Sequence, residues 1–105
     1  MNYLQGTLDV LILTALSKEP LHGYDVVDWI RTTTNETLQI DDGALYTSLH
    51  RMEKRGWLDP EWRISPKGRR AKYYRLTAEG RKQLRAGERN WARFADAVTK
   101  VFSAR

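Results

Sequence analysis

The sequence lacks cysteine, has only two histidines and contains no long apolar run, and each absence excludes a class of protein. Without cysteine, the chain forms no disulfide and has no thiol chemistry or cysteine-ligated zinc. Its apolar stretches fall short of the ~20 residues that a transmembrane helix needs, so we expect no membrane contact. The first 20 residues have no basic start, and Asp9 interrupts their apolar stretch, unlike a secretory signal. We therefore expect a folded, cytoplasmic protein.

Residues for catalysis are also scarce. His22 and His50 fall on different predicted helices, and the acidic residues of the first half show no metal-ligand spacing. Catalysis requires a convergent nucleophile, base or metal. The sequence therefore disfavours an enzyme, and it predicts no catalytic residue, no metal and no cofactor.

The basic residues are concentrated in the second half of the chain. Residues 1–50 hold two Lys/Arg and seven Asp/Glu, a net charge of −5. Residues 51–75 hold nine bases and three acids, and residues 76–105 hold seven and three, so their net charges are +6 and +4. A focused basic patch on a small domain often faces nucleic acid, although it can also be a solvated surface without a partner.

Apolar periodicity predicts three helices in the first half. The first spans roughly residues 4–18, where Leu4 and Leu8 begin a helical repeat, and the second spans roughly 22–34. The third begins near Asp41 or Asp42, either of which can cap it, and ends at Gly56. Its apolar stripe predicts the core residues Leu45, Leu49 and Met52. The opposite, polar stripe carries Gly43, Tyr46, Thr47, His50, Arg51 and Lys54.

The period changes to that of a β-hairpin after the third helix. Residues 57–64 read as a strand that Pro60 interrupts, residues 65–70 as a turn and residues 72–77 as the return strand. Four bases surround the turn. We expect Trp57 and Trp62, which bracket the first strand, to serve in packing rather than in base stacking.

A long last helix is predicted over roughly residues 77–103, with Thr77 as its N-cap. The capping box that would complete this start is missing, because Gly80 stands where Glu or Gln is expected. Heptad-like spacing gives the helix an apolar seam. Packing on its own core could use part of this seam, and a second copy of the chain is the simplest cover for the rest. The residues expected at this dimer interface are Leu84, Trp91, Phe94, Ala95, Val98, Val101 and Phe102.

Three helices, a hairpin and a final helix make a mainly α winged helix-turn-helix plan. We expect a DNA-binding domain over residues 1–76 and a C-terminal dimerisation helix over residues 77–105. The third helix would enter the major groove, and the hairpin wing would neutralise phosphates. The N-terminus of the second helix favours a phosphate oxygen. The expected DNA-binding residues are His22, Tyr24, Gly43, Tyr46, Thr47, His50, Arg51, Lys54, Lys67, Gly68, Arg69, Arg70 and Lys72.

The chain closely resembles the PadR family of transcriptional regulators. Four segments carry the resemblance in order over roughly residues 4–102: GTLDVLIL, LHGYDV, GALYTSLHRMEKRGWL and RRAKYYRLTAEGR. The family often has Pro and Ala after the Leu-Tyr of the third helix, whereas this chain has Thr47 and Ser48. Because Thr47 lies where that helix would meet DNA, the operator sequence of other members does not transfer.

The resemblance implies a homodimeric repressor that binds a pseudo-palindromic site on double-stranded DNA and pairs its final helices. The short C-terminal region is similar to that of the small members of the family. Some of these bind planar aromatic compounds between the final helices, where Trp91 and Phe94 would line a pocket. The alternative is that both residues are plain interface anchors. A different alternative for the whole chain is a winged-helix adaptor that binds proteins or ligands and leaves the wing idle.

Overall fold

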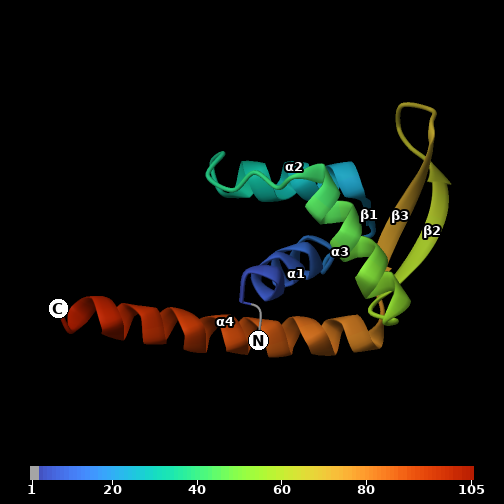
Figure 1. Cartoon of the computed structure of the whole chain (residues 1–105). Helices are drawn as coiled ribbons and strands as arrows, with labels where there is room; N and C mark the ends of the chain where they lie inside the picture. The colour runs from blue at the N-terminus through green and yellow to red at the C-terminus, as the bar shows by residue number, and fades with distance from the viewer. Residues whose placement is uncertain (1–2) are drawn as a thin grey trace.

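The structure, a computed structural model, describes the backbone of residues 3–105 and the side chains from Gly6 onwards (Figure 1). The side chain of Leu4, the first expected apolar position, lies outside the described residues. The helices are α1 (Tyr3–Ala15), α2 (Gly23–Thr33), α3 (Asp42–Lys54) and α4 (Ala78–Ser103), and the strands are β1 (Leu21–His22), β2 (Leu58–Ile64) and β3 (Arg70–Leu76). No helix of the described chain is long and apolar enough to cross a membrane.

Local sequence signals set both ends of α3. The carboxylate of Asp41 accepts a hydrogen bond from the backbone N–H of Ala44 at 3.1 Å, so the expected cap is confirmed. At the other end Gly56 adopts a positive φ of 79°, and the N–H of Trp57 donates to the carbonyl of Met52 at 3.0 Å. This arrangement satisfies free carbonyl groups and turns the chain towards β2.

The core fills the space between α1, α2, α3 and the base of the sheet. Leu45, Leu49 and Met52 are fully buried, so the predicted apolar stripe of α3 is confirmed. They pack with apolar side chains that the helical spacing of α1 and α2 directs inwards, among them Ile12 and Ile30. Burying one face of α3 in this way leaves the opposite face for solvent or a partner.

The sheet has three strands, in the order β1-β3-β2, where the sequence predicts two. The additional strand consists of Leu21, which pairs with Tyr74, and His22, which pairs with Tyr73. A strand of two residues is too short to show a period, so the pattern did not reveal it. The prediction that Pro60 interrupts the first hairpin strand is wrong. β2 is an edge strand, where the missing N–H of proline is tolerated.

Close backbone approaches fix the first half of α4 to its own domain. Thr77 caps the helix by accepting a hydrogen bond from the N–H of Gly80 at 3.0 Å, as expected. A Cβ on Gly80 would overlap the carbonyl oxygen of Trp57, which explains why a capping-box Glu or Gln is absent. A Cβ on Gly87 would likewise overlap the side chain of Val10 on α1. These contacts let α4 cross α1 directly.

Leu84 requires a correction, because it is 9% exposed and belongs to the core of its own chain rather than to a dimer interface. The heptad spacing could not separate the two roles, since both place an apolar side chain on the same stripe. Beyond this contact the second half of α4 extends past the domain (Figure 1).

Candidate nucleic-acid interface

The polar face of α3 is exposed as the sequence predicts. Tyr46, Thr47, His50 and Lys54 all lie on the surface, and Tyr46 is 52% exposed. The first three of them, with Tyr74 of β3, line a hollow of about 410 Å³. The hollow offers two tyrosines, a hydroxyl and an imidazole, which are groups that can donate to and accept from base edges or phosphates.

Two glycines allow close contacts at this surface, one between α2 and α3 and one within the first turn of α3. A Cβ on Gly23 would come within 3.0 Å of the Tyr46 ring, so the start of α2 lies directly against this tyrosine. A Cβ on Gly43 would lie 3.0 Å from the Asp41 carboxylate that caps α3. Both glycines therefore serve local packing. Gly43 also has no side chain to project from the surface at the start of α3.

His22 and Tyr24 lie at the start of α2, with different surroundings. His22 is the N-cap, and its Nδ1 accepts from the N–H of Asp25 at 3.3 Å while Nε2 lies 3.1 Å from the Asp25 carboxylate. Its ring also meets Tyr73 edge-on at 5.3 Å. Both imidazole nitrogens of His22 thus have partners within the chain. Tyr24 is exposed and free to reach outwards.

Arg51 was expected on the polar face of α3, but it faces α1. Its guanidinium forms two hydrogen bonds to the Asp9 carboxylate, at 2.7 and 2.9 Å, and both side chains are largely buried. The planar fork of arginine matches a carboxylate in this geometry. Because Asp9 occupies its guanidinium, we no longer assign Arg51 to the DNA interface. Asp9 itself enters as a residue that joins α1 to α3.

The hairpin tip is a tight turn that presents unpaired cations. The N–H of Ser65 donates to the carbonyl of Arg69 at 2.7 Å, and Gly68 has a φ of 79°, which favours glycine. Lys67 and Arg69 are exposed on this turn and belong to none of the ion pairs found in residues 6–105. The tip therefore holds two cations ready for an anionic partner.

Two other wing bases have partners inside the chain. The amine of Lys72 lies 2.9 Å from the Glu53 carboxylate of α3, and this hydrogen bond raises the pKa of Lys72 above its usual value. Lys72 thus ties the wing to α3. The guanidinium of Arg70 stacks 4.6 Å from the centre of the Trp62 ring, which leaves its N–H groups able to donate outwards.

The sequence missed the exposed apolar face of the wing. Trp57 packs partly against the core, as expected, but Trp62 is 57% exposed and Ile64 is 69% exposed. Register puts Trp62 opposite Lys72 and Ile64 opposite Arg70, on the strand face that also carries buried Leu58 and Leu76. Strand alternation through Leu58, Trp62 and Ile64 was the signal that would have shown this face. This apolar face of the hairpin extends past the part of the sheet that packs on α3.

The second half of α4, which extends past the domain, carries the remaining residues expected at the dimer interface. The rings of Trp91 and Phe94 lie 5.8 Å apart in a tilted arrangement. Ala95 and Val98 are half-buried, whereas Val101 and Phe102 are exposed. No group of three His, Cys, Asp or Glu side chains in residues 6–105 is placed to hold a metal ion.

A helical domain with an exposed α3 and a cationic hairpin beside it defines the winged-helix class of DNA-binding proteins. Residues 12–86 match the transcriptional regulator PadR-like family, and the chain therefore belongs to that family. This confirms the resemblance noted in the sequence.

Solved structures of transcriptional regulators agree with this assignment, and one curated relative is similar in sequence. A transcriptional regulator from Clostridium thermocellum is 29% identical, with a TM-score of 0.85 over 95% of this chain and 97% of its own. A PadR family regulator from Eggerthella lenta is 34% identical, with a TM-score of 0.79 over 97% of this chain and 88% of its own. An uncharacterised protein from Lysinibacillus sphaericus is 28% identical over 95 residues, 90% of this chain and 87% of that protein.

Proposed function

We propose that the protein is a dimeric repressor of transcription that binds a pseudo-palindromic operator in the cytoplasm. The observation that carries the proposal is the exposed polar face of α3 with the cationic wing beside it. α3 enters the major groove, where Thr47 and His50 meet base edges and Tyr46 and Lys54 meet the backbone. Tyr24 lies at the edge of this surface.

The wing holds the phosphates through Lys67, Arg69 and Arg70. Lys72 contributes less, because its amine is paired with Glu53. Three contacts per subunit give six per dimer, so the slope of log K against log salt concentration reaches about −5. Gly68 keeps the tip narrow enough to approach the backbone.

The free half of α4 supplies the dimer contact through Trp91, Phe94, Ala95, Val98, Val101 and Phe102. The pairing sets the distance between the two α3 helices, which must be about 34 Å for half-sites one DNA turn apart. A planar aromatic compound that binds between Trp91 and Phe94 of the two subunits would favour one dimer geometry. If that geometry does not hold the two α3 helices one DNA turn apart, the compound releases the repressor from its operator.

DNA binding by four variants tests this division of roles. We expect Arg69→Ala and Arg70→Ala to weaken binding to operator and random DNA alike, since phosphates carry no sequence. Thr47→Ala and His50→Ala should instead change the preferred sequence, by about 1–3 kcal/mol per base contact. The measurement is fluorescence anisotropy with both DNAs at several salt concentrations. Equal losses for both sets would refute the proposed reading of bases by α3.

The competing function is a winged-helix adaptor that binds a protein or a ligand without DNA. It requires the wild-type protein to ignore its own promoter DNA at low salt, where electrostatic contacts are strongest. A gel-shift experiment under that condition decides between the two functions.

A further inference from the structure

The outer face of α4 carries basic side chains that the proposed function does not use. Four of them are exposed and follow one another at spacings of three, four and four residues: Lys82, Arg85, Arg89 and Arg93. At about 100° per residue they fall within a sector of roughly 80° around the helix. Every residue of this sector between positions 79 and 95 is a base. We call these four residues the basic row of α4.

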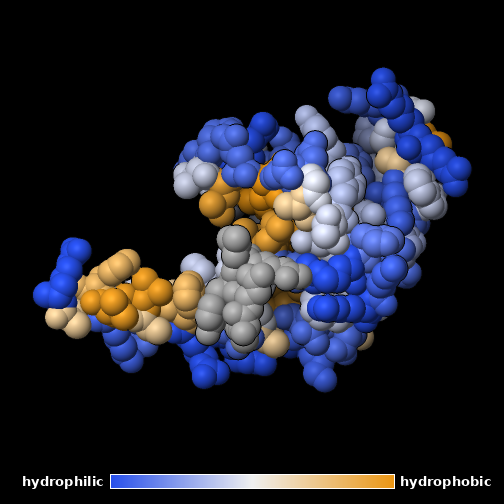
Figure 2. Space-filling view, viewed as in Figure 1, coloured by the Kyte–Doolittle hydropathy of each residue, from blue (hydrophilic) through white to orange (hydrophobic). Residues whose placement is uncertain are grey.

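The basic row lies on the side of α4 that faces away from the domain. Gly80 and Leu84 are buried, and a Cβ on Gly87 would overlap the side chain of Val10 on α1. The mean direction of these three α4 residues is opposite to that of the row at about 100° per residue. Figure 1 shows α1 between α4 and the rest of the helices, and Figure 2 shows mostly hydrophilic surface along the outer edge of α4.

The contact proposed between subunits leaves the row uncovered as well. Trp91 and Val98 follow Leu84 by seven and fourteen residues, so they lie on the same side of α4 as the buried positions. Pairing of the two seams therefore buries the side opposite the row.

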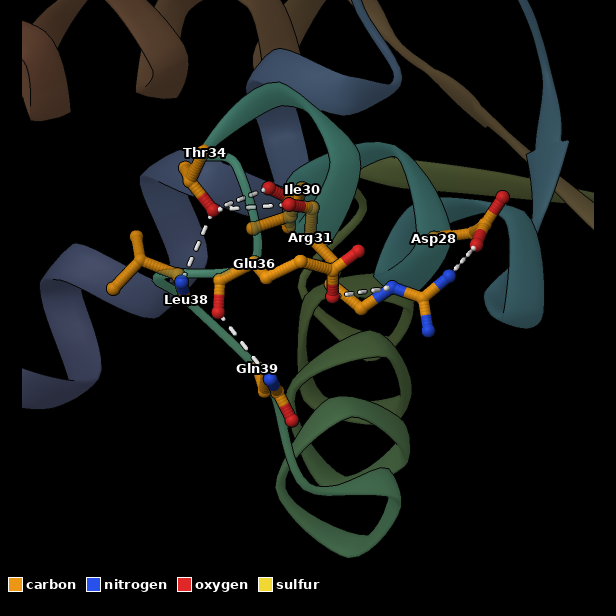
Figure 3. A network of polar contacts seen from close by, with 7 residues as sticks. All are labelled: Asp28, Ile30, Arg31, Thr34, Glu36, Leu38 and Gln39. Atoms are coloured by element: carbon orange, nitrogen blue, oxygen red, sulfur yellow. Dashed lines mark hydrogen bonds and ion pairs between the residues drawn. The ribbon is translucent and has the colours of Figure 1, made fainter.

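Arginines elsewhere in the chain have carboxylate partners. Figure 3 shows Arg31 between Asp28, at 2.6 Å, and Glu36, at 3.4 Å. No member of the basic row belongs to any of the ion pairs found in residues 6–105. The row is thus an accumulation of positive charge that the described part of the chain does not neutralise.

Acids close to the row along α4 do not change this balance. Glu88 forms no ion pair with any described base, and Asp96, which follows the row on the same face, is paired with Lys100 at 3.1 Å. Like charges four residues apart, such as Arg85 and Arg89, destabilise a helix. An anionic partner would remove that repulsion.

The composition of the row favours a phosphate backbone over a protein surface. Three of its four bases are arginine, whose planar fork binds a phosphate through two parallel hydrogen bonds. The centre of a protein–protein interface is apolar and poor in charge, whereas the sector of the row has only Ala86 and Ala92 at its edges. Protein–DNA interfaces are polar and strongly positive.

The length of the row also suits a duplex. From Lys82 to Arg93 the helix rises about 16 Å, at about 1.5 Å per residue. A DNA duplex carries about ten phosphate charges over that length. All four bases can therefore meet a phosphate at the same time.

We propose that the basic row binds the phosphate backbone of a second DNA duplex, on the side of the domain away from the duplex that α3 and the wing hold. The inference goes beyond the proposed function and rests on it only for the first duplex. A single straight duplex does not contact both the wing tip and the row, because α1 and the body of α4 lie between them (Figure 1). The protein at its operator thus holds another DNA segment, without reading its sequence.

A ternary complex tests the proposal. A donor-labelled duplex that contains only the operator is saturated with the protein, and an acceptor-labelled random duplex is added at low salt. We expect energy transfer between the two, and sedimentation should give one protein dimer with more than one duplex. Arg85→Gln combined with Arg89→Gln should weaken capture of the random duplex roughly tenfold or more. The slope of log K against log salt concentration for that step should change from about −4 to about −2.

Matched controls separate the row from net charge. Lys18→Gln combined with Arg105→Gln also removes two exposed cations that belong to no ion pair in residues 6–105, but both lie off the row. We expect this variant to capture the random duplex as the wild type does. Arg85→Lys combined with Arg89→Lys keeps the charge and should keep the salt slope. Circular dichroism checks that all variants fold.

The outcomes distinguish this inference from the proposed function. Operator binding without capture of the random duplex would overturn the inference and leave the function intact. Equal capture by the row variant and the Lys18 and Arg105 control would do the same. So would a loss of affinity only for an operator with long flanks, because the DNA would then bend around one protein.

Two further results have a defined meaning. Capture of polyglutamate but not of the random duplex would contradict the inference and assign the row to an acidic protein. A protein that binds no operator would refute the proposed function instead. A direct titration with the random duplex would still decide the inference, since only the row variant should then lose affinity.

Discussion

Cations are used differently at the tip of the wing and at its base, which here means α3 and the strand residues that are joined to it. At the base, Arg51 pairs with Asp9 and Lys72 with Glu53, at 2.7 and 2.9 Å. At the tip, Lys67 and Arg69 have no acid within reach among the described residues. The difference teaches that basic composition alone does not define a DNA-binding surface. A cation near a carboxylate of its own chain becomes part of the scaffold, and one beyond that reach stays available to phosphates.

Breaking the pair at the base should have the largest effect on the protein. We expect Arg51→Ala to lower the free energy of unfolding by about 3–5 kcal/mol, because it leaves the largely buried carboxylate of Asp9 without its partner. Thermal unfolding followed by circular dichroism, at one fixed protein concentration, measures the loss. For a domain of this size it lowers the melting temperature by more than about 10 °C.

An exposed pair of equal length provides the matched control. Arg75 lies 2.7 Å from Asp59, the same distance as in the Asp9–Arg51 pair, but both of its side chains are more than half exposed. We expect Arg75→Ala to cost less than about 1 kcal/mol, since water screens exposed pairs. If both variants lost the same stability, burial would not be what distinguishes the base of the wing.

The sequence predicted the features that depend on neighbours along the chain. The Asp41 and Thr77 caps, the apolar stripe of α3 and the Gly68 turn each rest on residues within a few positions of one another. Short-range spacing predicts such features correctly, because helices and turns are formed by residues close together in the chain. The fold class followed from their order.

Contacts between distant residues were out of reach. Asp9 and Arg51 are 42 positions apart, and no sequence pattern in either helix indicates that they form an ion pair. The same holds for Lys72 with Glu53, for β1 against β3, and for Leu84, whose stripe fits a core and a dimer seam equally well. The sequence therefore predicted the helix and the hairpin that carry the candidate site, but it counted among its cations Arg51 and Lys72, which are paired within the chain.

Removing charge from the tip sharpens the comparison through DNA binding. We expect Arg69→Gln to reduce the salt slope by about 0.9 per subunit, or about 2 for the dimer, because one phosphate contact is lost in each. Lys72→Gln should reduce it by less than half as much, since Glu53 already neutralises that amine. Anisotropy titrations between low and moderate salt give the slopes. Equal slopes for the two variants would remove the distinction between base and tip.

The smallest expected effect concerns how the tip cations are aimed. Arg70 lies 4.6 Å from the Trp62 ring, and such exposed stacking is worth about 0.5–1 kcal/mol. Trp62→Ala frees the guanidinium without removing its charge, so we expect affinity to fall roughly 5- to 30-fold for two wings while the salt slope stays unchanged. Trp62→Phe, which keeps a ring beneath Arg70, should recover most of the affinity. A changed slope in Trp62→Ala would mean that the ring decides whether Arg70 reaches a phosphate at all, and Trp62 would then count with the tip rather than with the scaffold.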